Sequence, residues 1–312
     1  MPMLTPAEIA NPHLDWNLAR DVSQLVEYHF MVNALLAGAI VAIMAGLVGW
    51  VIVLRREAFA GHTLAVMAFP GASAATLVGI PVAWGYFAFC GVGAFAIGRF
   101  SGSERGSWSE ESAGIGAVQA SALAAGFLFV SLYGGVLGGL ESLLFGNILG
   151  VSDGEVLVLA LVGAGTLAVL AALGRPLLFA SVDPDVARAR GVPVGALSSV
   201  FLLLLGLAVA ATSQITGPLL VFALLVMPAA TAQALTARPA LSLALTVALA
   251  LTVTWLGLGI SYFSAYPAGF FISTISFAIY VLARMWAALA RRLGSGHGLA
   301  PAMEPPPRGV IA

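Results

Sequence analysis

Residues 30–54 read FMVNALLAGAIVAIMAGLVGWVIVL, and this stretch decides the fold. It carries no charged side chain and ends at the pair Arg55-Arg56. About 20 consecutive apolar residues are enough for a helix to cross the hydrocarbon core of a bilayer. The run does not alternate between apolar and polar positions, and an open sheet edge in lipid would leave backbone groups without hydrogen bonds. The stretch therefore predicts a membrane-spanning helix.

Eight further apolar runs follow this one. They cover residues 62–81, 83–99, 113–133, 155–174, 196–212, 218–236, 240–261 and 268–289. Hydrophobic residues make up 60% of the chain and charged residues only 9%, whereas a soluble domain carries roughly 25% charged residues. We therefore expect an all-α, polytopic transmembrane helical bundle with about 8–9 spans. The first 29 residues lack the apolar core of a cleavable signal peptide.

The chain has no lysine, and its arginines recur at every second boundary between spans. Eleven of the thirteen arginines lie at these boundaries: Arg55, Arg56, Arg99, Arg105, Arg175, Arg188, Arg190, Arg238, Arg284, Arg291 and Arg292. Loops rich in arginine stay in the cytoplasm, so we expect the N-terminus outside and the C-terminus inside. Residues 1–29 then form an extracytoplasmic segment, residues 30–290 the transmembrane domain, and residues 291–312 a disordered cytoplasmic tail. The glycine-rich stretch 134–154 is expected to be a re-entrant or interfacial helix on the outer side.

Several kinds of chemistry are missing from the sequence. It has no GxxxxGK[ST] motif for ATP, no Ser/His/Asp or GxSxG arrangement for nucleophilic catalysis, and no acidic residue in the middle of a span. Carriers coupled to protons or sodium usually hold the coupling ion on such a residue. We therefore expect a protein that is not an enzyme and that takes its energy from another chain. A secondary transporter or channel acting alone, and a scaffold without flux, remain alternatives.

The longest charged cytoplasmic loop is expected at residues 175–195. Within it, Asp183-Pro184-Asp185 is typical of a helix start, with a carboxylate as N-cap and proline just inside the first turn. We expect a short helix from Val186 to Arg190 that Gly191 terminates, with Arg188 and Arg190 exposed. This helix is either an ordinary capped loop helix or a coupling helix that docks into a cytosolic partner.

The segment DPDVARARGVPVG, residues 183–195, resembles the cytoplasmic loop of permeases from bacterial zinc/manganese-type metal ABC importers. Three other stretches resemble that family in the same order along the chain. They are FAGHTLAVMAFPG (59–71), ESLLFGNILGVS (141–152) and GPLLVFALLVMPAATA (217–232). The resemblance covers roughly residues 30–290 and implies the fold of a type II ABC importer permease.

The same resemblance implies partners and roles. We expect a homodimer in the bacterial inner membrane, two cytosolic ATP-binding-cassette subunits that use the ATP, and an extracytoplasmic substrate-binding protein, with no nucleic-acid partner. The chain itself would bind no cofactor, and its cargo would be a divalent metal ion, zinc or manganese, with a non-metal substrate as the alternative. The residues expected to couple to the ATPase are Asp183, Pro184, Asp185, Arg188, Arg190 and Gly191.

The second span departs from the family pattern. Family members read Gly-Asp-x-x-x-His-x-x-x-Pro-Gly, with the Asp and His contacting the metal, whereas His62 and Val66 occupy those positions in this chain. His62 is therefore either a metal contact or a lone histidine at the membrane interface. Met67 and Met227 are the other candidates for a metal or substrate path, although single methionines in apolar helices usually serve as packing.

Overall fold

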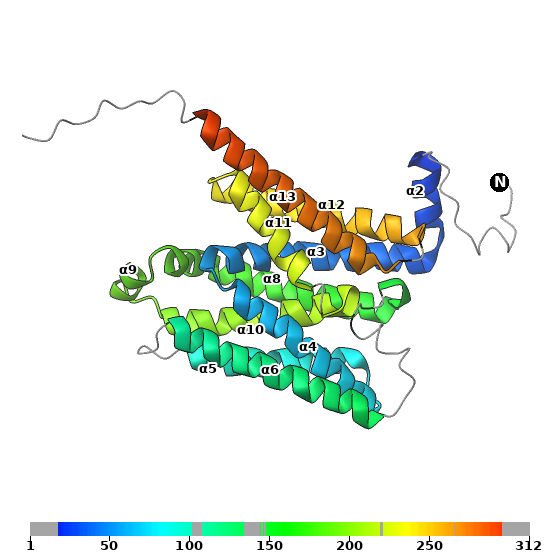
Figure 1. Ribbon diagram of the computed structural model, residues 1–312, viewed down its shortest axis with the longest axis horizontal. Coiled ribbons are helices and arrows are strands. Elements are labelled where there is room, and N and C mark those ends of the chain that lie inside the picture. Colours follow the sequence, from blue (N-terminus) through cyan, green and yellow to red (C-terminus); the bar gives the residue numbers. More distant parts are fainter. Residues whose placement is uncertain are drawn as a thin grey trace, which may run out of the picture.

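The computed structural model describes residues 18–101, 108–133, 144, 146, 148–218, 221–264 and 266–294, and all regular structure in these ranges is helical. The helices form one elongated bundle, shown in Figure 1. They are α2 (Leu18–Glu27), α3 (His29–Arg55), α4 (Ala58–Val78), α5 (Val82–Ser101), α6 (Trp108–Tyr133), η1 (Ile148–Gly150), α8 (Asp153–Val182), α9 (Pro184–Ala189), α10 (Val194–Thr216), α11 (Val221–Leu235), α12 (Pro239–Tyr262) and α13 (Ala268–Gly294). The predicted all-α transmembrane bundle is confirmed.

Eight of the described helices are long and apolar enough to cross a membrane, and α11 is a ninth apolar helix of 15 residues. Each overlaps one of the nine runs found in the sequence. α4 continues through Pro70 without a break. Helix α9 lies at one end of the bundle and α2 at the other (Figure 1), and these are called the α9 end and the α2 end.

Small residues on α3 let its neighbours approach closely. A β-carbon on Gly49 would lie 1.8 Å from the carbonyl oxygen of Leu225 in α11, and one on Gly38 would lie 3.0 Å from Thr254 and from Leu258 in α12. In lipid the hydrophobic effect does not draw helices together, so van der Waals packing at such small residues does much of that work. α3 and α4 are accordingly the two most buried of the eight long helices that the structure describes.

α11 does not run the full length of the bundle. At about 1.5 Å per residue it is roughly 22 Å long, which is less than the ~30 Å hydrocarbon core. Leu225 lies beside Gly49, and the Gln233 amide donates a 2.9 Å hydrogen bond to the carbonyl oxygen of Trp50. Gly49 and Trp50 both belong to the last seven residues of α3, which lie near the α9 end. α11 therefore occupies only the α9 half of the bundle. The expected full span at 218–236 is therefore wrong in length.

Two other expected boundaries are also wrong. α8 passes Arg175 and Pro176 and continues to Val182, so the expected loop 175–195 shrinks to the short joints around α9. Leu177 and Ala180 are buried there, and their packing outweighs the hydrogen bond that the proline removes. α13 likewise continues to Gly294, into the expected tail 291–312. Residues 1–17, 295–312 and most of the expected re-entrant segment 134–154 lie outside the described residues.

The contact between α3 and α11 gives a test of this packing. Gly49→Ala places a methyl group against the backbone of Leu225, so we expect it to lower the free energy of unfolding by ~2 kcal/mol or more, as overpacking does. The measurement is the shift in unfolding midpoint of the detergent-solubilised protein. Gly91→Ala is the matched control, because a β-carbon at Gly91 meets nothing within 4 Å. Equal midpoints for the two variants would show that the close approach is not needed.

Candidate functional site

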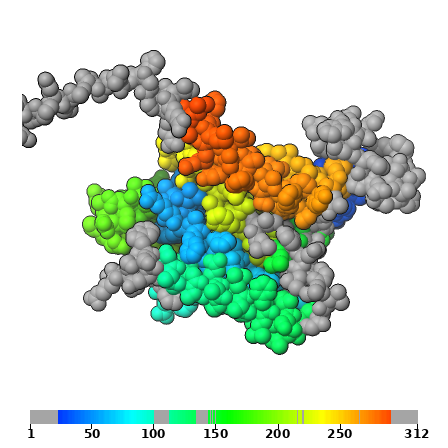
Figure 2. All heavy atoms as spheres, viewed as in Figure 1, coloured from blue at the N-terminus to red at the C-terminus, as the bar shows by residue number. Residues whose placement is uncertain are grey.

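α4 and α11 lie side by side on one face of the bundle, between α13 and α6 (Figure 2). Along α4, Phe59 is 46% exposed, and His62 and Val66 are half-buried, which follows the three- and four-residue spacing of one helix face. The His62 ring meets the Phe222 ring of α11 edge-on, with the two ring centres 5.4 Å apart. We call this partly open surface the α4–α11 face.

The structure does not bring all three path candidates together. Met67 is buried on another side of α4, because a β-carbon on Gly93 of α5 would lie 3.0 Å from Met67 Cγ. Met227 is half-buried on α11, where its carbonyl oxygen accepts a 2.8 Å hydrogen bond from Thr231. Within the described residues, no group of three or more His, Cys, Asp or Glu side chains could hold a metal ion. A single chain thus offers His62 as its one strong ligand on the α4–α11 face.

Helix α9 forms with the predicted caps, but it covers Pro184–Ala189 and not the predicted Val186 to Arg190. The Asp183 carboxylate accepts a 3.0 Å hydrogen bond from the amide of Val186, and Pro184 occupies the first turn. At the other end Gly191 has a φ of +80°, the left-handed conformation that favours glycine. Ala187 is fully buried, which fixes α9 against the bundle.

The polar side chains of α9 remain available to a partner. Arg188 and Asp185 form an ion pair of 2.8 Å, with side chains 57% and 88% exposed. Such an exposed pair contributes only about 0–1 kcal/mol, so Arg188 can exchange Asp185 for another acidic group at little cost. Arg190 is the C-cap residue and is exposed. The predicted arrangement of this candidate coupling helix is therefore present.

A buried arginine at the base of α9 was missed as a functional candidate. In the sequence Arg55 marked only the end of a span, but its side chain is 8% exposed and it has polar partners outside its own helix. The signal that could have found it is the acidic residue Glu57 two positions later, directly before the next span. Together they form a charged cluster inside the α9 end of the bundle.

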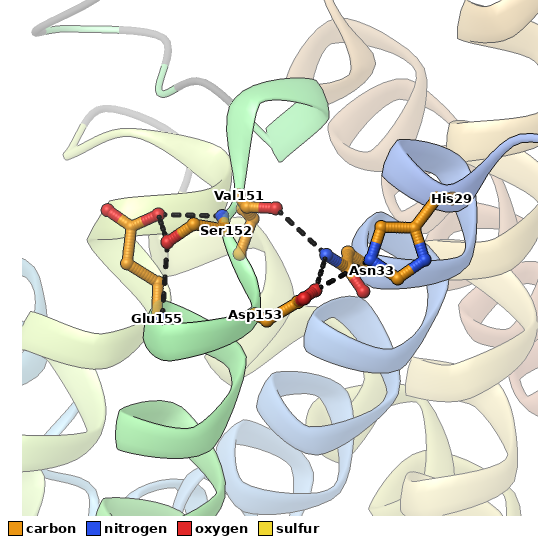
Figure 3. Close-up of polar contacts among 6 residues, drawn as sticks. All are labelled: His29, Asn33, Val151, Ser152, Asp153 and Glu155. Atoms are coloured by element: carbon orange, nitrogen blue, oxygen red, sulfur yellow. Dashed lines mark hydrogen bonds and ion pairs between the residues drawn. The ribbon is translucent and has the colours of Figure 1, made fainter.

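A second polar cluster joins the helices at the α2 end, as Figure 3 shows. The Asp153 carboxylate lies 2.8 Å from His29 Nε2 and accepts a 2.5 Å hydrogen bond from the Asn33 amide. Ser152 and Glu155 form a capping box at the start of α8. The Ser-x-x-Glu spacing was readable in the sequence, whereas the pairing of His29 with Asp153 depends on the fold. The cluster fastens the N-terminal ends of α3 and α8 to each other.

The eight long apolar helices among the described residues define the class of the protein as a polytopic membrane protein. The chain belongs to the ABC 3 transport family, whose sequence model matches residues 27–287. The resemblance seen in the sequence is thereby confirmed, and the chain is a multi-pass permease of an ABC transporter. Membership of this family implies partner ATPase and substrate-binding subunits.

Relatives and a solved structure support this assignment. The chain is 34% identical over 222 residues to the manganese transport system membrane protein MntC of Halalkalibacterium halodurans, covering 71% of this chain and 75% of the relative. It is 30% identical over 261 residues to the manganese import system permease protein ScaB of Streptococcus gordonii, covering 84% and 92%. PsaBC from Streptococcus pneumoniae in complex with Fab has a similar fold, with a TM-score of 0.76, 28% identity and coverage of 88% and 99%.

The cap of α9 can be tested directly. Asp183→Ala removes the acceptor for the Val186 amide, so we expect α9 to lose about 1 kcal/mol of stability. Hydrogen exchange at the amides of residues 186–189 should then be roughly fivefold faster. Asp183→Asn keeps a capping oxygen and serves as the control. Unchanged exchange in the alanine variant would mean that packing of Ala187 alone holds the helix.

Proposed function

We propose that this chain is the permease subunit of a bacterial ABC importer for a divalent metal ion. The observation that carries the proposal is the similarity, over most of the chain, to relatives named as manganese transport permeases. The chain binds no cofactor and has no ATPase site, so ATP is used by separate subunits. The protein works by alternating access, in which the partner subunits reorient the helices around a central path.

We place the α9 end in the cytoplasm. Arg55 ends α3, Arg99 lies in the last turn of α5, and Arg238 caps α12, and all three belong to boundaries on the arginine-rich side. The positive-inside rule then puts the N-terminus outside and the C-terminus inside. In this orientation α9 meets the ATPase through its exposed polar residues Asp185, Arg188 and Arg190. The α2 end faces the substrate-binding protein.

Two copies of the chain complete the path. The α4–α11 face of one chain is partly exposed and carries one histidine, which is too few ligands for a metal ion. A two-fold axis along this face would place the same surface of a second copy opposite it. The two His62 side chains then meet at the axis, with Met227 as a softer thioether contact beside the path. Two ligands hold an ion loosely, as a transit site requires.

The names of the relatives and the residues of this chain favour different cargo ions. The names of the relatives favour manganese. The chain's own residues favour zinc, because His62 stands where the family carries a carboxylate, and imidazole suits Zn²⁺ whereas Mn²⁺ prefers oxygen donors. The identity of the residue at position 62 therefore governs the choice between the two ions.

The metal path predicts the behaviour of position 62. In proteoliposomes holding the permease, its ATPase and its binding protein, His62→Ala should lower metal uptake about tenfold or more, since even the loss of an outer-shell partner of a metal ligand costs at least about that much. His62→Asp should raise the ratio of manganese to zinc uptake. Val92→Ala is the control, since Val92 is 64% exposed on α5 and has no part in the proposed path. Normal uptake by His62→Ala would remove His62 from the path, and a wild-type complex that moves no metal would refute the metal cargo.

The dimer predicts which positions cross-link. A cysteine at Val66 lies on the α4–α11 face, and a copper oxidant should join two chains through it in native membranes. A cysteine at Val92 is the control, because Val92 is 64% exposed on α5, away from that face. The native Cys90 is fully buried and should not contribute. Cross-linking through position 92 but not through position 66 would place the dimer contact elsewhere.

A further inference from the structure

Arg55 connects both helices that flank α9. Its guanidinium group donates a 2.7 Å hydrogen bond to Ser198 in the first turns of α10 and a longer one, 3.5 Å, to Ser181 in the last turn of α8. α8 ends at Val182 and α10 begins at Val194, so short segments connect α9 to both helices. Ser181 and Ser198 are therefore anchor points close to where α9 joins the bundle on either side.

The same guanidinium group is tied to the start of α4. Its Nε and Nη2 atoms lie 2.9 and 2.7 Å from the same carboxylate oxygen of Glu57. Glu57 is the N-cap residue of α4, only five positions before His62. The turn between α3 and α4 is tight, because Arg56 adopts a φ of +60° and the amide of Glu57 donates to the carbonyl oxygen of Ile52. A displacement of Arg55 must therefore move the first turn of α4.

The cluster is partly buried, and the guanidinium group of Arg55 is well enclosed. The side chains of Arg55 and Glu57 are 8% and 27% exposed, and the guanidinium carbon lies 5.4 Å from the centre of the buried Phe201 ring. Burial of the guanidinium group makes the two charges interact more strongly than a fully exposed pair would. The second carboxylate oxygen of Glu57 is buried without a hydrogen-bond partner. The carboxylate thus keeps an open acceptor position for a second arrangement of the cluster.

We propose that Arg55 is a positioning residue that transmits the displacement of α9 to α4, and so to the transport path. When the two flanking helices move with α9, Ser181 and Ser198 move the guanidinium group, and Glu57 carries the motion into the first turn of α4. Only arginine suits this position, because its planar fork reaches several acceptors at once, whereas lysine presents a single charge. The inference rests on the proposed role of α9 as the contact with the ATPase.

The experiment measures the number of metal ions transported per ATP hydrolysed by the full complex in proteoliposomes. For Arg55→Gln we expect this ratio to fall about tenfold, within the usual range of coupling between sites, while ATP hydrolysis remains close to wild type. Arg56→Gln is the matched control, since Arg56 is the exposed neighbour, and its ratio should not change. Ser198→Ala removes one hydrogen bond, keeps the charge pair with Glu57, and should lower the ratio less.

Two results would overturn the proposal. One is an unchanged ratio in both Arg55→Gln and Ser198→Ala. The other is a parallel fall in transport and hydrolysis together with a lower unfolding midpoint in both variants, which would make Arg55 a purely structural residue. Failure of the proposed function has a different signature, because the wild-type complex would then transport no metal at all.

Discussion

The structure depends on backbones that come close together in a medium where the hydrophobic effect does not draw helices to one another. α3 meets α11 at Gly49 and α12 at Gly38, and α4 meets α5 where Gly71 and Gly85 face each other. At these points dispersion contacts between backbones replace the side-chain interlocking of a soluble core. The buried hydroxyl groups of Thr212 and Ser213 donate to carbonyl oxygens four residues earlier in their own helix. These hydroxyl groups are satisfied locally, and a few polar contacts between helices, such as the hydrogen bond from Gln233 to the carbonyl oxygen of Trp50, add to the packing.

Much of the fold was readable from the sequence because length and polarity decide it. Runs long enough to cross a bilayer became helices, and the Asp-Pro-Asp signal at 183–185 produced the cap that it predicts. The boundaries that failed are those where packing overrides local signals. Pro176 did not end α8, because Leu177 and Ala180 are buried beyond it. The shortness of α11 was also hidden, since the composition of residues 218–236 resembles that of a full span.

The candidate sites also divide into those set by local sequence and those set by the fold. His62 and α9 could be located from motifs, because each depends on neighbours in the sequence. The cluster around Arg55 could not, since its partners Ser181 and Ser198 come from helices more than 120 residues away. Serine is common and carries no pattern that marks it as an arginine partner. At the opposite end, the contact of His29 with Asp153 is equally distant in the chain. Such polar contacts become visible only when the fold is known.

The short α11 gives the described part of the bundle different cross-sections in the two leaflets of the bilayer. Among the described helices, eight are long enough to occupy both leaflets, and α11 adds its width only on the α9 side. A helix is about 10 Å across, so the described part of the chain is about one helix wider on the α9 side. Two copies joined along their α4–α11 faces would lean apart in the leaflet where each copy is narrower. Lateral pressure from the lipids in that leaflet would resist this tilt. Lipids of different headgroup size should therefore shift the balance between the two states of the alternating-access cycle.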